Sequence, residues 1–161
     1  MLHGHGMRGR QVRGPLRPDG RPEEVEITAR RYRCQRCCAV LTVMPCGVLR
    51  SCLFSASAIG LALALWAVHR LPARQVRLRA SPWSVVGATA AGGWASLRRW
   101  VRQAPRLFPG VRPCPDDWTD RQRAERIATS LAACSPAVDG PLAERVFAGA
   151  AQAMRAGSQL R

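Results

Sequence analysis

Two cysteines, Cys34 and Cys37, have the C-x-x-C spacing at which two thiolates from one turn can bind a single Zn²⁺. A tetrahedral site needs four ligands, and His3 and His5 could supply two imidazoles from the N-terminal segment. Three further cysteines could complete a local site instead: Cys38, Cys46 and Cys52. The spacing therefore makes zinc a possible cofactor at Cys34, Cys37, His3 and His5, in a site that we expect to be incomplete, against the alternative of a lone C-x-x-C with ordinary thiols.

Carboxylates that could support catalysis are few, and three of them (Asp116, Asp117 and Asp120) cluster at the start of a predicted helix. Carboxylates at that position interact favourably with the helix dipole, so we expect a capping role. The sequence has no G-x-S-x-G, Walker or H-E-x-x-H motif. It therefore predicts a protein that is not an enzyme and has no small-molecule substrate. The alternative is a metal-dependent recombination enzyme that uses Asp116 or Asp117.

The positive charge is carried by arginine alone, because all 25 basic residues are Arg and the chain contains no Lys. The formal net charge of +15 comes from residues 1–112, which hold 19 arginines and four acidic residues. Residues 113–161 hold six of each and are neutral. Residues 27–115 contain no Asp or Glu, and self-repulsion on that scale favours a polyanionic partner such as duplex DNA.

The clearest amphipathic helix is predicted over residues 93–107. Its apolar positions share one arc of the helix: Trp94, Leu97, Trp100, Val101 and Ala104. The opposite arc carries four arginines that we expect to bind phosphates: Arg98, Arg99, Arg102 and Arg106. Such a helix would lie between a hydrophobic core and an anionic partner.

Two earlier segments, 55–70 and 72–80, are predicted to form helices that complete a helix-turn-helix with 93–107. The helix at 93–107 would then enter a major groove, and Arg74, Arg77 and Arg79 would lie near phosphates as a second set. The alternative is that these arginines form the solvated face of an ordinary helical bundle. The absence of balancing acids favours nucleic acid over that alternative.

Residues 51–69 form a run of nineteen uncharged residues, close to the roughly 20 that span a bilayer. A helix that is apolar on all sides is either buried in a core or embedded in a membrane. The run is rich in Ala, Ser and Gly, and arginines lie on both sides of it, so we expect a core helix. A small membrane protein anchored by residues 51–69 is the alternative.

The elements that position these residues divide the chain into four predicted regions. Residues 1–22, rich in Gly, Pro and Arg, would form a flexible basic arm, and residues 23–48 a strand, C-x-x-C turn and strand. Residues 49–112 would form the helical domain, and residues 113–161 a hairpin of helices near 119–133 and 141–156. The odd cysteine count and the lack of a secretory signal predict a cytoplasmic protein.

Residues 31–37, Arg-Tyr-Arg-Cys-Gln-Arg-Cys, followed by Val40–Pro45, resemble the second half of the zinc ribbons of bacterial insertion-sequence transposases. Residues 53–59, 71–76 and 93–100 resemble a transposon-associated bacterial family of unknown function with a zinc ribbon and a helix-turn-helix. The resemblance implies that Cys34 and Cys37 are the second ligand pair. The first C-x-x-C of the family would lie just before residues 2–6, where this chain starts, and Cys38 stands in place of the usual Gly.

The sequence therefore predicts a mainly α fold with a small β zinc-ribbon-like knuckle, a helix-turn-helix core and a C-terminal helical hairpin. The predicted function is that of a transposase-like or transposon-associated protein that binds double-stranded DNA and has no catalytic domain of its own. Residues 113–161 could also provide a surface for self-association.

Overall fold

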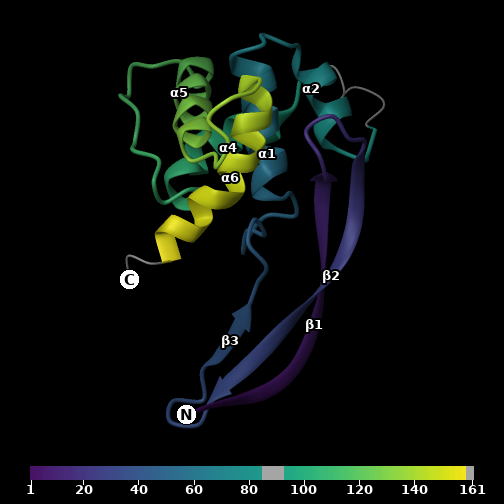
Figure 1. Cartoon of the computed structure of the whole chain (residues 1–161), viewed down its shortest axis with the longest axis vertical. Coiled ribbons are helices and arrows are strands. Elements are labelled where there is room, and N and C mark those ends of the chain that lie inside the picture. Colours follow the sequence, from purple (N-terminus) through teal and green to yellow (C-terminus); the bar gives the residue numbers. More distant parts are fainter. Residues whose placement is uncertain (85–92, 159–161) are drawn as a thin grey trace.

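The computed structural model describes residues 1–84 and 93–158, in which three strands form an arm beside a body of five helices (Figure 1). The strands are β1 (Leu2–Pro15), β2 (Pro22–Cys34) and β3 (Val40–Val43), which form an antiparallel sheet in the order β1-β2-β3. The helices are α1 (Ala56–Ala67), α2 (Ala73–Ala80), α4 (Ala95–Leu107), α5 (Asp120–Ala133) and α6 (Leu142–Ser158).

The arm is a long hairpin whose two strands pair along nearly their whole length. Pairing runs from Pro15 opposite Pro22 to Leu2 opposite Cys34, with a register shift between Gly4 and Met7. The tight turn between β1 and β2 lies against the helical body, and the opposite end projects away from it with the N-terminus (Figure 1). β3 pairs with the distal part of β2, so the outer half of the arm is three-stranded.

Hydrogen bonds from β1 hold the arm to the chain that leads into the helical body. The Arg10 guanidinium donates to the carbonyl oxygens of Leu49 and Cys52, at 2.5 and 2.9 Å. The backbone N–H of Arg13 donates to the Leu53 carbonyl, and the Ser55 N–H donates to the Arg13 carbonyl. Because these contacts join segments some 40 residues apart, they fix the direction in which the arm leaves the body.

The helical body is built around α1, which contacts α2, α4, α5 and α6. Ile59, Leu63 and nearly every other residue of α1 are buried, which explains why the helix is apolar on all sides. Its twelve residues span about 18 Å. The expected core helix within residues 51–69 is thus confirmed. Among the helices that the structure describes, none combines the length and apolar character that crossing a membrane requires.

The other helices begin and end close to where the sequence predicts them. In α4 the five predicted apolar residues are buried and all four arginines are exposed, as the periodicity requires. Thr119 caps α5 in a capping box with Gln122, and of the three clustered carboxylates only Asp120 lies in the first turn, as expected, because Asp116 and Asp117 precede the helix. α6 extends to Ser158, one residue past Gly157, which the sequence predicts to close the helix.

The predicted fold class is wrong, because the chain is a mixture of α and β structure and not a mainly α protein with a small zinc-ribbon-like knuckle. The main error lies in residues 1–22, where a flexible arm was predicted and residues 2–15 form β1. Glycine- and arginine-rich sequence has little strand propensity of its own. Here the backbone of β2 supplies the hydrogen bonds that make it a strand.

The boundary predicted at residue 113 does not separate two hydrophobic cores. Trp100 and Phe108 before that boundary belong to the same buried cluster as Ile127, Leu131 and Val146 after it. The helices of the predicted C-terminal hairpin, α5 and α6, pack against each other and against α1, so they share its core.

Candidate nucleic-acid interface

The two faces of the arm differ in chemistry, because successive side chains of a strand point to opposite faces. In the pairing register Arg8 and Arg10 of β1 lie on the same face as Arg31 and Arg33 of β2. We call these four arginines the basic face. The other face carries three exposed apolar side chains near the aromatic ring of Tyr32, with Arg30 over that ring: Met7, Leu41 and Val43.

The basic face forms one wall of a cleft of about 1020 Å³ between the arm and residues 44–53. Arg8, Arg10 and Arg31 line the cleft from the arm, and Arg50 lines it from the facing segment. Arginines on both walls, with no Asp or Glu among the described residues that line it, make this cleft electropositive.

The guanidinium groups of the basic face and of Arg50 form no ion pair with a carboxylate among the described residues. Four ion pairs occur within the described residues: Arg13–Glu24, Arg70–Glu125, Arg98–Asp120 and Arg123–Asp116. None of them involves the basic face or Arg50. Arg10 is held by backbone carbonyls, so Arg8, Arg31 and Arg33 are the members of the basic face left to bind an anion.

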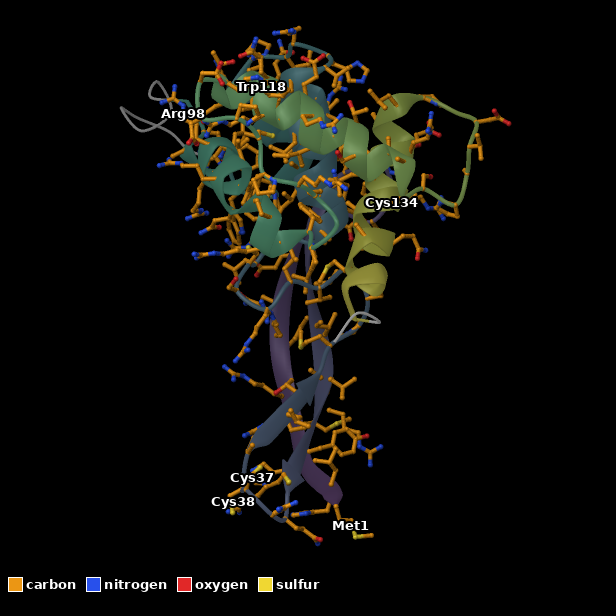
Figure 2. All side chains as sticks on the ribbon, turned by 90° about the vertical axis from the view of Figure 1, so that its left-hand side faces the viewer. Met1, Cys37, Cys38, Arg98, Trp118 and Cys134 are labelled. Carbon is orange, nitrogen blue, oxygen red and sulfur yellow. The ribbon has the colours of Figure 1, made fainter. Side chains whose placement is uncertain are left out.

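The arginines predicted from the sequence on α2 and α4 lie on the helical body, at the opposite end of the molecule from Cys37 and Cys38 (Figure 2). Arg77 of α2 and Arg99 of α4 line one cavity, whereas the other five do not: Arg74, Arg79, Arg98, Arg102 and Arg106. Arg74, Arg79, Arg102 and Arg106 are exposed to solvent, and Arg98 lies 3.8 Å from Asp120. The structure therefore brings only Arg77 and Arg99 of the predicted set to one cavity, and the basic face was not predicted from the sequence.

The C-x-x-C motif lies in the turn between β2 and β3, at the tip of the arm. The backbone N–H groups of Cys37 and then Arg36, followed by the Cys37 side chain, hydrogen-bond to the Cys34 sulfur and lower the pKa of that thiol. Cys38 has a φ of 58°, the left-handed conformation that glycine adopts most easily, so its place in the motif is one that favours Gly. The turn thus favours a thiolate at Cys34.

The two predicted imidazole ligands lie on β1, with His3 opposite Arg33 and His5 within the register shift. Within the described part of the chain, no group of three or more His, Cys, Asp or Glu side chains is arranged to hold a metal ion. The structure brings Cys34 and Cys37 to one turn and so fits half of a tetrahedral set. Zinc binding by these residues stays a prediction.

The lowered pKa of Cys34 predicts that folding speeds the reaction of this thiol. At pH 7 iodoacetamide is expected to modify Cys34 faster in the folded protein than in urea, because the hydrogen bonds of the turn favour its thiolate. Peptide mass spectrometry after short exposures, from pH 6 to 9, measures both rates. A Cys34 that reacts no faster in the folded protein than in urea would contradict the proposed turn geometry.

No protein-family model matches this chain, and no curated protein or solved structure shows significant similarity to it. The candidate interface therefore rests on the arrangement of this chain's own residues.

Proposed function

We propose that this protein binds duplex DNA by placing its arm along a groove and its free arginines on the phosphates. The observation that carries the proposal is the basic face, where Arg8, Arg31 and Arg33 lie together without a carboxylate partner. Strands of a β-sheet can lie in a groove of B-DNA, and guanidinium groups pair well with phosphate oxygens. Arg50, on the other wall of the cleft, would contact a second phosphate strand.

The exposed arginines of α4 would add contacts from the helical body, as the predicted helix-turn-helix requires. In line with the resemblance described above, the protein would bind the DNA of a mobile element without cleaving it. We place it in the cytoplasm, where its seven cysteines would stay reduced, with zinc at Cys34 and Cys37 as a structural addition. Self-association through residues 113–161 stays a separate prediction.

A double variant, Arg31→Ala with Arg33→Ala, tests the basic face directly. Fluorescence anisotropy with a labelled 20-base-pair duplex is expected to show weaker binding and a log–log salt slope shallower by about 2, since two phosphate contacts are lost. The matched control, Arg112→Ala with Arg126→Ala, removes the same charge from exposed positions outside the arm and α4. Equal losses in the two double variants would contradict a role for the arm.

A second double variant, Arg98→Ala with Arg102→Ala, distinguishes the contribution of the arm to DNA binding from that of α4, the helix predicted to bind DNA from the sequence. If α4 also lies on the DNA, this variant is expected to lose affinity beyond the control. If the Arg98→Ala, Arg102→Ala variant binds as the Arg112→Ala, Arg126→Ala control does, while the arm variant is impaired, the arm alone forms the interface. The predicted helix-turn-helix interface would then be wrong.

A further inference from the structure

A cavity of about 560 Å³ lies where the base of the arm meets α2 and α4. It brings together three arginines from segments far apart in the sequence, Arg13 of β1, Arg77 of α2 and Arg99 of α4, with Trp83 beside them. Among the described residues that line it there is no Asp or Glu. Its volume falls in the range of sites that hold small organic ligands.

Two of the three guanidinium groups keep donors available to an anion. Arg13 is paired with Glu24 at 2.6 Å and is thus neutralised. Arg77 is half-buried and lines the cavity, and within the described residues no ion pair or side-chain hydrogen bond holds its guanidinium. Arg99 is exposed and donates from one nitrogen to Ser96 Oγ at 3.3 Å. An anion between Arg77 and Arg99 would satisfy both groups.

The neutral part of the wall also suits an anion. Burial raises the pKa of the Cys52 thiol, which lines the cavity, so this thiol adds no negative charge at neutral pH. The cavity is also lined by three aromatic rings that pack edge to face, with centroids 4.9 to 5.8 Å apart: Phe54, Trp94 and Trp100. These rings make a rigid apolar floor.

Trp83 also lines the cavity but differs from those rings, because 54% of its surface is exposed. Its indole N–H donates to the Glu24 carboxylate at 3.4 Å, and the Arg13 guanidinium lies 5.8 Å from the ring centroid. The same Arg13–Glu24 pair therefore orients the indole in an exposed position. An exposed, oriented aromatic ring beside unpaired arginines is the combination that binds an unstacked base and its phosphate.

We propose that this cavity binds a single unpaired nucleotide, with the base stacked on Trp83 and the phosphate between Arg77 and Arg99. The inference deepens the proposed function, on which it rests for the source of the nucleotide, a frayed or single-stranded end of the bound DNA. A free nucleoside monophosphate has the same chemistry and is the other source to be tested.

The test compares Trp83→Ala, Trp83→Phe and Arg99→Gln for binding of labelled ten-nucleotide oligothymidylate and of a blunt duplex. Trp83→Ala is expected to weaken oligothymidylate binding roughly 5- to 150-fold, the range for loss of one stacking platform, and Trp83→Phe to restore most of it. Arg99→Gln is expected to weaken it as well. The control is Trp118→Ala, which removes an exposed tryptophan that does not line the cavity. Duplex affinity is expected to change little in the three tryptophan variants, whereas Arg99→Gln also removes a proposed phosphate contact of α4 and is not used as a duplex control.

Competition with thymidine monophosphate and with inorganic phosphate identifies the ligand. If the nucleotide displaces the oligonucleotide and phosphate does not, the cavity recognises base and phosphate together, and free nucleotides are a source. If neither displaces it while Trp83→Ala still weakens it, the source is the strand. Equal competition by phosphate, or unchanged oligonucleotide binding by Trp83→Ala, overturns the proposal. The basic-face variant Arg31→Ala, Arg33→Ala reports separately on the proposed function, because it tests duplex binding at residues outside this cavity.

Discussion

Raising the salt concentration from 50 to 200 mM is expected to weaken the binding of duplex DNA by about a thousandfold. Six arginines without a carboxylate partner are assigned to phosphates in the proposed complex: Arg8, Arg31, Arg33, Arg50, Arg102 and Arg106. Each phosphate that an arginine neutralises releases a counterion, so log affinity falls with a slope of about −0.9 per contact against log salt. Six contacts give a slope of about −5.

Anisotropy titrations at four salt concentrations across that range measure the slope. Circular dichroism at each concentration checks that the protein stays folded, so that lost affinity is not lost structure. A slope near zero would be incompatible with an interface made of arginine and phosphate, and the proposal of DNA binding would then be abandoned.

Replacing Gly149 with Ala is expected to lower the free energy of unfolding by about 3 kcal/mol, the upper end of the usual cost of overpacking. A Cβ at this position would overlap the carbonyl oxygen of Leu131 and lie 2.9 Å from its carbon and 3.0 Å from the Ser135 nitrogen. These are backbone atoms and cannot turn aside, so α6 would have to move away from α5. That movement would loosen Val146 and Ala150 from the core.

Urea denaturation followed by circular dichroism measures this change. The sign of the change in unfolding free energy is informative, because Ala is more stable than Gly inside a helix by up to about 1 kcal/mol when its Cβ meets no other atom. Gly110→Ala is the control, since no atom lies within 4 Å of its added Cβ, and we expect a change within about 0.5 kcal/mol. A Gly149→Ala protein as stable as the original would show that α5 and α6 do not approach so closely.

The helices could be predicted from the sequence because their patterns are local. In α4 the apolar residues recur with the helical period, so its buried and exposed faces follow from spacing alone. α1 has no polar face, and the choice between core and membrane depended on whether other helices cover it. Trp100 of α4 and Val146 of α6 are among the residues that share its core.

β1 could not be predicted because its stability is not local. Gly4, Gly6, Gly9 and Gly14 give it neither alternation nor strand propensity, and it exists as a strand through its pairing with β2. The basic face depends on that pairing, because only the register places Arg8 beside Arg31. The alternation of Arg31 and Arg33 in β2 was a visible signal, and it would have predicted two members of the basic face.

The cavity between the base of the arm, α2 and α4 could not be predicted from the sequence for the same reason. Arg13, Arg77 and Arg99 belong to three different elements, and no pattern in the chain connects them. By contrast, the Cys34–Cys37 turn is a short-range feature, and the substitution of Cys38 for the usual Gly marked a position that is indeed left-handed.

The outer half of the arm has an open strand on each side, β1 on one edge and β3 on the other. Open edges can pair with the edges of other molecules, and this leads to aggregation unless charge or an irregularity prevents it. The shift between Gly4 and Met7 interrupts one edge, and the arginines of β1 and β2 keep two arms apart by mutual repulsion. Their positive charge therefore protects the free protein from edge-to-edge pairing, and neutralising it would remove that protection from a sheet that also exposes Met7, Leu41 and Val43.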